Sequence, residues 1–349
     1  MMCGTVCGQF VSLVHVFPNL DKIMDVLYMF IAVSMVLFKL VITYNWHWKK
    51  LKFCLDFLDE DWLQVTHAWE KEIMRTYARY GRLFNIFFMS NYTATWVFVV
   101  SQRIYDYLQN KTTKDHIFKV RYFFDVHMSP NFELVFAYQF IQGTATTLCN
   151  GGVDGILVIF IYHLYGQLEI LKRKLINLLT FYKANKSIIS QHSFNKQLGQ
   201  LIQRHLQLIH FASVVEETFN FMILGQLFVS SLIMCVLGFR IIMTVEDSDL
   251  AILVQFILFQ ISMTTEIFIY CYCGEKIISQ SQSVSYAVYE TEWFDCPAQV
   301  AKMLLVLMIR TEQSLCITAG KLYVMNLENF TSILKTSLSY LSVLRTIKD

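Results

Sequence analysis

Long apolar runs constrain this chain more than any other feature of its sequence. A helix that crosses a bilayer needs about 20 predominantly apolar residues, because its backbone hydrogen bonds must close inside the segment. Ile23–Tyr44 has this length and is interrupted only by Asp25, Ser34, Lys39 and Thr43. Further runs are Leu83–Leu108, Phe132–Ile161 with its four glycines, Phe219–Ile242, Leu250–Cys273 and a last one that begins near Leu322. With a first run at Met1–Phe17, the pattern predicts an all-α integral membrane protein with seven transmembrane helices.

Composition supports the same class and excludes others. The 349 residues are 55% hydrophobic and only 16% charged, whereas a soluble domain carries about 25% charged residues. A net charge of +2 excludes a generally basic nucleic-acid binder. No spacing of cysteine and histidine suits zinc, so we expect neither a metal nor another cofactor.

The first run, Met1–Phe17, is too short to cross a bilayer alone. It lacks the basic segment that opens a signal peptide. We therefore expect it to be the second half of a first span whose beginning is missing from this sequence.

Lysines and arginines near the ends of the runs predict the orientation. The segments 47–82 and 171–213 carry seven lysines and arginines each. By contrast, the link between the first two runs carries only Lys22, and the link before Leu250 has only Arg240 beside it. Because basic residues mark the cytosolic side, the N-terminus is expected inside and the C-terminus outside, opposite to a G-protein-coupled receptor. The sequon at Asn110 then falls in an extracellular loop and is a candidate glycosylation site.

The basic segments also keep apolar residues at helical spacing, as at Leu198, Leu201 and Ile202. We expect the spans to continue as helices into a cytosolic anchor bundle; a solvent-exposed amphipathic helix is the alternative. The predicted organisation is a partial first span at 1–17, spans two to four at 23–170, a cytosolic helical link at 171–213, spans five and six at 214–273, a cytosolic turn and anchor helix at 274–319, and the last helix at 320–349.

The last helix carries a polar stripe. Seven positions at spacings of three and four share one face, namely Asn326, Asn329, Ser332, Thr336, Ser339, Val343 and Thr346. Hydroxyls and amides on a membrane helix suit a water-filled path, but small polar residues also pack helix against helix. The residues alone leave both interpretations open.

Two blocks near the C-terminus resemble the signature of insect odorant receptors. The first comprises the hexapeptide Tyr270–Glu275, Ser281, Ala287–Tyr289 and Trp293. The second comprises Thr318–Lys321, Ser337–Tyr340 and Leu344–Arg345. Weaker similarity extends through Asp154 and His205 to the segment Asp59–Trp62.

This resemblance implies an odorant-gated, non-selective cation channel in which four subunits surround one pore. An odour-specific subunit assembles there with a shared co-receptor in the plasma membrane of sensory dendrites, with lipid around it, and binds a small volatile hydrophobic odorant. The co-receptor type has a long insertion between spans four and five, for which segment 171–213 has no room. The resemblance therefore implies the odour-specific type.

The resemblance also implies where ligand and ions pass. The ligand site lies in the outer half of spans two, three, four and six, which here corresponds to Met29, Val33, Tyr92, Trp96, Phe140, Thr144, Phe256 and Phe259. The last helix lines the pore, with its narrowest, hydrophobic point at Val343 and Ile347 and with Thr346, Ser339 and Thr336 along the path. The alternative for the aromatic residues is ordinary packing or contact with lipid.

Charged residues inside the runs have a structural interpretation. Asp154 and Glu266 are expected to pair with a lysine or a polar group and to hold helices in register, and Lys39 to extend toward the cytosol. An enzyme is disfavoured, because no phosphate-binding loop, metal cluster or catalytic motif occurs. The alternatives that stay open are a gustatory-type channel of the same superfamily and a secondary transporter, although we find no internal repeat.

Overall fold

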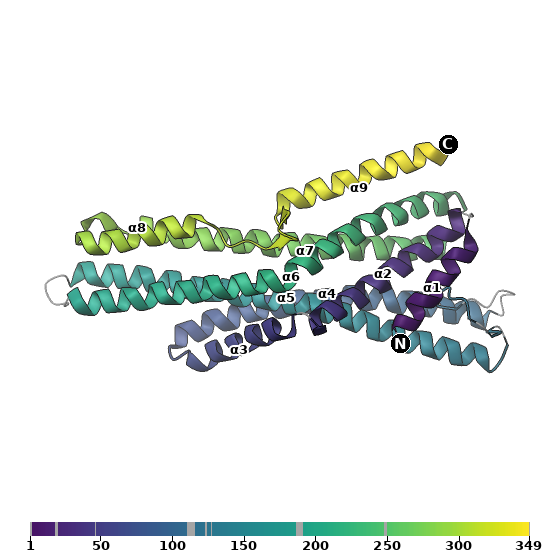
Figure 1. Ribbon diagram of the computed structural model, residues 1–349, viewed down its shortest axis with the longest axis horizontal. Coiled ribbons are helices and arrows are strands. Elements are labelled where there is room, and N and C mark those ends of the chain that lie inside the picture. The colour runs from purple at the N-terminus through teal and green to yellow at the C-terminus, as the bar shows by residue number, and fades with distance from the viewer. Residues whose placement is uncertain are drawn as a thin grey trace.

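A computed structural model describes residues 2–17, 20–45, 47–109, 116–122, 124–126, 128–185, 191–247 and 250–348. This part of the chain is almost entirely helical (Figure 1). Its elements are α1 (Met2–Val16), α2 (Leu20–Asn45), α3 (Trp48–Gln64), α4 (Ala68–Leu108), α5 (Asn131–Ala184), α6 (Gln191–Asp247), α7 (Leu250–Tyr289), the 3₁₀ turn η1 (Trp293–Asp295), α8 (Ala298–Glu312), the strands β1 (Thr318–Ala319) and β2 (Tyr323–Val324), and α9 (Leu327–Lys348).

The helices form an elongated bundle with two unlike halves. One half holds α1, α2, α9 and both chain ends, and the other holds α3 and α8, while α4, α5, α6 and α7 extend into both (Figure 1). Each of these four helices is longer than the apolar run that predicted it, with 41, 54, 57 and 40 residues. The expectation that spans continue as helices beyond the apolar runs is thus confirmed for residues 68–72, 168–184 and 191–211. Residues 51–64 are helical too, but they belong to the separate helix α3 and do not continue α2.

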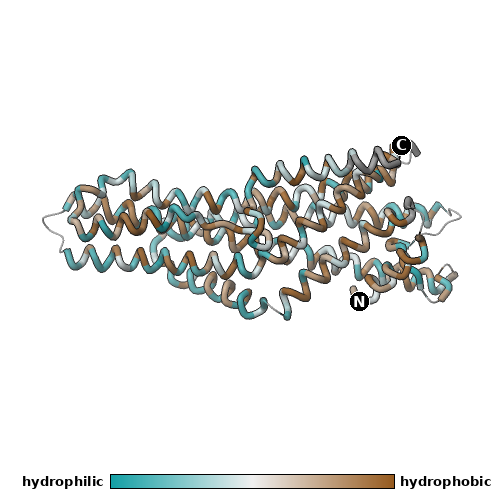
Figure 2. Tube along the Cα trace, turned by 45° about the horizontal axis from the view of Figure 1, so that its top comes forward, coloured by the Kyte–Doolittle hydropathy of each residue, from teal (hydrophilic) through white to brown (hydrophobic). Residues whose placement is uncertain are grey.

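Five helices are long and apolar enough to cross a membrane among the residues described: α2, α4, α5, α6 and α7. Helix α1 is apolar but has only 15 residues, and α9 has 22 residues of more mixed character. Figure 2 shows the hydropathy of each residue. The helices are mostly brown, or hydrophobic, in the half that holds both termini, and they are mixed teal and brown in the other half. The four glycines between Phe132 and Ile161 do not interrupt α5, since the neighbouring helices support it there.

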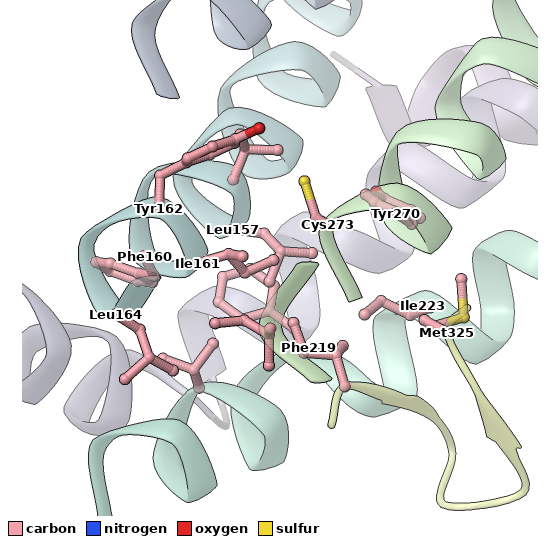
Figure 3. Packing of buried hydrophobic residues seen from close by; sticks show 14 of the residues in the cluster. Leu157, Phe160, Ile161, Tyr162, Leu164, Phe219, Ile223, Tyr270, Cys273 and Met325 are labelled. Carbon is pink, nitrogen blue, oxygen red and sulfur yellow. The ribbon is translucent and has the colours of Figure 1, made fainter. Parts of the chain in front are cut away.

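The core lies where α5, α6 and α7 cross. Leu157 and Ile161 of α5 face Phe219 and Ile223 of α6, and Cys273 of α7 completes the cluster (Figure 3). These side chains are at most 4% exposed, so they exclude both water and lipid. Close packing of this kind, rather than the hydrophobic effect, holds helices together inside a bilayer.

A polar network joins three helices in the half that holds α3. Asp61 of α3 accepts a hydrogen bond from Arg204 of α6 at 2.5 Å and contacts Nε2 of His163 of α5 at 2.8 Å. Arg204 also donates to Gln167 at 3.1 Å. Apolar contacts support the network, with the ring of Phe57 stacked on Phe211 at 4.7 Å between centroids. The segment around Asp61 thereby fixes α3 against the long helices.

A hairpin determines where the last helix begins. Strands β1 and β2 pair antiparallel around Gly320 and Lys321, which both have positive φ, at 60° and 61°, as a type I′ turn requires. The side chain of Asn326 then accepts the backbone N–H of Asn329 at 2.8 Å and caps α9. The helix therefore begins at Leu327 rather than near Leu322.

Candidate functional site

A cavity of about 110 Å³ lies inside the half of the bundle that holds both chain ends. Five helices and the segment between α4 and α5 line it. The lining residues are Met29, Ala32, Val33, Met35 and Val36 of α2, Tyr92, Thr95, Trp96 and Val99 of α4, Phe118 of the segment between α4 and α5, Gly143, Thr146, Thr147 and Asn150 of α5, Gln226, Val229 and Ile233 of α6, and Phe259, Ser262 and Met263 of α7. The wall is mostly apolar, as is typical of sites for small organic molecules.

The cavity brings together five of the eight residues that the sequence nominated for ligand binding. Met29 and Val33 come from α2, Tyr92 and Trp96 from α4, and Phe259 from α7. They lie one helical turn apart on α2 and α4, so each pair presents one face to the cavity. The nominated pairs therefore lie on the faces of α2 and α4 that line the cavity.

The other three nominated residues do not line the cavity. Phe140 is 44% exposed and stacks on the outer side of Trp96. Thr144 lies behind the same indole, where its hydroxyl accepts the Nε1–H of Trp96 at 3.1 Å. Phe256 is buried against Tyr28 in an edge-to-face contact, with the guanidinium of Arg240 over its ring. These three side chains support the wall from behind.

The absence of a side chain on Gly143 positions Trp96. A Cβ at Gly143 would lie 2.0 Å from Cη2 of the indole, so only glycine lets the ring lie flat against α5. The ring of Phe118 stacks on the same indole with centroids 6.0 Å apart. Phe118 is held in turn by Gln139, whose side chain accepts its N–H at 2.8 Å and donates to its carbonyl at 3.1 Å. This clamp closes the cavity with a residue outside any apolar run.

A buried charge cluster lies beside the cavity. The ammonium of Lys39 contacts carboxylate oxygens of Asp154 at 2.8 Å and Glu266 at 3.0 Å, and the amide oxygen of Asn150 at 2.9 Å. Lys39 is 1% exposed, so the expectation that it extends toward the cytosol is wrong. The two carboxylates inside the bundle stabilise the Lys39 ammonium more than the distant membrane surface would. The expectation that Asp154 and Glu266 pair with a lysine and join helices is confirmed.

Tyrosines complete the cluster. Tyr270 donates to Asp154 at 2.5 Å, and Tyr92 donates to the other oxygen of Asp154 at 3.3 Å. Tyr92 also lines the cavity, and the hydrogen of its hydroxyl is engaged by the acid. Gln226 of α6 donates to Glu266 at 2.9 Å. Helices α2, α4, α5, α6 and α7 are thus linked through one polar cluster.

The sequence reasoning missed Gln226, Ile233 and Phe118 among the lining residues. It chose aromatic and apolar residues on four spans and left out the fifth, to which Gln226 and Ile233 belong. A polar side chain inside an apolar run was the available signal for Gln226. Phe118 gave no signal, because only the clamp by Gln139 brings it to the cavity.

Helix α9 carries the residues nominated for the pore. Thr336 and Ser339 are exposed, and each donates its hydroxyl to a carbonyl four residues earlier in its own helix. Helix α9 packs on the bundle through Phe330, Ile333 and Leu334 and runs along the same side as the C-terminal part of α6 (Figure 1). The backbones of Val343, Thr346 and Ile347 belong to α9, but their side chains lie outside the described part of the chain, as does Asn110 with its sequon.

Two members of the polar stripe have other tasks. Asn326 caps α9, and the amide of Asn329 donates to the carbonyl of Val324 at 2.7 Å. On the bundle side, Ser337 is buried and its carbonyl is contacted by the thiol of Cys235. The neighbouring Leu338 is 63% exposed. The exposed polar face therefore begins at Ser332.

The fold and cavity define a class of protein: a multi-span helical membrane protein with a mostly apolar cavity among its helices. No group of three histidine, cysteine or acidic side chains that could hold a metal occurs among the residues that the structure describes. The family model described as 7tm Odorant receptor matches residues 19–338. The chain belongs to this odorant receptor family, whose members are receptors and not enzymes.

Individual relatives agree with this assignment. Odorant receptor 13a of Drosophila melanogaster is 26% identical over 205 residues, which cover 56% of this chain and 48% of that protein. Odorant receptor 47a of the same species is 27% identical over 228 residues, covering 64% and 56%. The chain thus spans about half the length of the curated relatives it matches.

A solved structure shares the fold. The insect olfactory receptor OR5 from Machilis hrabei, in complex with eugenol, superposes with a TM-score of 0.84 at 14% sequence identity and covers 99% of this chain and 88% of that chain. A second structure of the same receptor superposes with a TM-score of 0.80. The resemblance seen in the C-terminal blocks is confirmed at the level of family and fold.

Proposed function

We propose that this chain is the odour-specific subunit of an odorant-gated, non-selective cation channel, which binds a small volatile molecule in the cavity and opens a pore shared with a co-receptor. The observation that carries the proposal is the mostly apolar cavity among α2, α4, α5, α6 and α7 in a member of the odorant receptor family. The Machilis receptor, with the same fold, is described in complex with eugenol. A small organic molecule bound to a receptor of this fold supports a ligand of that kind here.

Helix α9 is the proposed pore helix. Its exposed hydroxyls at Ser332, Thr336 and Ser339 suit an ion path, and the helix lies at the edge of the bundle, where its exposed face could meet helices of other subunits (Figure 1). A hydrophobic ring at Val343 and Ile347 would block ions by dewetting until the helices separate. In this arrangement α9 points toward the extracellular side, and the half holding α3 and α8 lies in the cytosol of a sensory dendrite.

Co-expression with an insect odorant co-receptor tests the function. Currents evoked by a chemically broad set of volatiles are recorded in whole cells and in excised patches without nucleotide. Cation current that needs both chains and appears within milliseconds supports the proposal. Uptake of a substrate by this chain alone would favour a transporter instead.

The pore assignment has a separate test. Val343→Ala or Ile347→Ala removes bulk from the proposed hydrophobic ring, so ligand-free current should rise several-fold. Leu338→Ala, on the exposed flank of the same helix, serves as the matched control for truncating a large side chain. Unchanged basal current in both ring variants, at equal surface expression, would count against this gate.

A further inference from the structure

One polar side chain in the cavity wall has an acceptor that nothing satisfies. Gln226 lines the cavity and is 3% exposed. Its Nε2 donates to Oγ of Ser230 and to Glu266, both at 2.9 Å, which uses both amide hydrogens. Its Oε1 is buried and has no hydrogen-bond partner. A buried carbonyl without a donor loses the hydrogen bonds that it would make to water, so a donor supplied by a ligand would stabilise it.

No free donor of the adjacent lysine can satisfy this oxygen. The three hydrogens of the Lys39 ammonium match the three oxygens it contacts, those of Asp154, Glu266 and Asn150. The cluster also sets one ammonium against two carboxylates. This side of the cavity therefore has acceptors to spare.

The hydroxyls in the wall are committed as well. Thr146 and Thr147 donate to carbonyls of their own helix at 2.9 Å, and Ser262 contacts the carbonyl of Leu258 and the side chain of Asn91 at 3.0 Å. Thr95 contacts the oxygen of Ser262 at 2.9 Å. A ligand that only accepts hydrogen bonds, such as an ester or a ketone, thus meets wall hydroxyls whose hydrogens are already used.

We propose that this cavity selects small apolar molecules that carry a hydroxyl donor at one end, with Oε1 of Gln226 as the acceptor. The inference rests on the proposed function, because it specifies the ligand class of the same cavity. The apolar body would lie against Met29, Val33 and Phe259. A cavity of about 150 Å³ in another protein binds benzene, so a volume of about 110 Å³ suits ligands of one small ring or a short chain.

Isosteric ligand pairs provide the test. Phenol and toluene, or cyclohexanol and methylcyclohexane, differ by a hydroxyl in place of a methyl group. The measured quantity is the half-maximal concentration of the hydrocarbon divided by that of its alcohol, in channels formed with the co-receptor. Comparing this ratio between wild type and a variant cancels the difference in ligand hydration. Any other active ligand is compared with its own methyl isostere in the same way.

Gln226→Met keeps an unbranched side chain of similar length and removes the acceptor. The ratio should fall about tenfold, the value of one net hydrogen bond. Gln226→Asn keeps the amide but shortens the side chain by one methylene, which moves the acceptor away from its position in Gln226. The ratio should fall in this variant too. Ser230→Ala is the matched control, since it removes a partner of Gln226 and leaves Oε1 in place, so the ratio should hold.

The outcomes separate the two levels of the proposal. A ratio that stays at the wild-type value in both Gln226 variants, with responding channels, overturns the hydroxyl preference and leaves odorant gating intact. Hydrocarbons that activate wild type while their alcohols do not would overturn it too. The absence of any current across the whole set of volatiles, with both chains at the surface, instead refutes the proposed function.

Discussion

Replacing Lys39 by methionine is the sharpest test of the buried charge cluster. Methionine keeps the unbranched shape, so packing changes little, while Asp154 and Glu266 lose the ammonium that holds them at 2.8 and 3.0 Å. The two acids are 1% and 0% exposed and have no water to turn to. Removing one partner from a buried pair costs about 3–5 kcal/mol.

The loss should appear as a lower melting temperature in detergent. For a chain of this size, a shift of about 2 °C accompanies each kcal/mol, so Lys39→Met should melt about 6–10 °C below wild type. Fluorescence-detected size-exclusion chromatography after heating measures this without purification. Unfolding of a membrane protein is often irreversible, and the order of the variants therefore carries the argument.

Two further variants control the interpretation. The triple change Lys39→Met, Asp154→Asn and Glu266→Gln removes all three charges and should recover most of the loss, because neutral groups of similar volume commonly replace a buried ion network without penalty. Lys50→Met breaks an exposed pair with Glu217, 40% and 44% exposed, and should cost at most about 1 kcal/mol. The reasoning is refuted if Lys39→Met melts with wild type, or if the triple variant melts no higher than Lys39→Met.

Three other substitutions test separate contacts. Gly143→Ala places a Cβ 2.0 Å from the ring of Trp96, so ligand potency should drop and stability should fall by about 1–3 kcal/mol; unchanged dose–response curves would contradict the wall described above. Gly274→Ala places a Cβ 2.0 Å from the carbonyl oxygen of Met325, and should change basal or maximal current more than ligand rank order, which recordings with several ligands can separate. Arg204→Met should lower the melting temperature by the equivalent of about 1–2 kcal/mol and leave ligand preference unchanged. This loss is smaller than that expected for breaking a fully buried pair, because Arg204 is 26% exposed.

The apolar runs predicted the helices well because hydrophobic length is a local property. Ile23–Tyr44, for example, nearly coincides with the apolar stretch of α2. The helix extensions beyond the apolar runs were also predictable from helical spacing, as at Leu198, but the point where α9 begins was not. That point depends on the hairpin at Gly320 and the cap at Asn326, which are turn chemistry rather than periodicity.

The cavity was only partly predictable, for a related reason. Residues on one helix face, such as Tyr92 and Trp96, follow from spacing, but which faces meet depends on helix rotation. Lys39 lies 115 residues from Asp154 and 227 from Glu266 in the sequence. Its partners therefore depend on tertiary structure, which no local sequence pattern specifies. The cost of a charge in a membrane predicts that it has a partner, without specifying which one.

Helix α7 connects the cavity to the beginning of α9 more directly than chain order suggests. In the structure, Glu266 of α7 belongs to the charge cluster, and two turns further on Gly274 lies against the carbonyl of Met325, while Glu275 accepts the backbone N–H of Leu327 at 3.4 Å. We therefore expect a displacement of α7 at the cavity to reach the first residue of α9 within one continuous helix. Because Gly274 allows this close approach, the contact is the place where a single methyl group should disturb the proposed coupling between the cavity and α9.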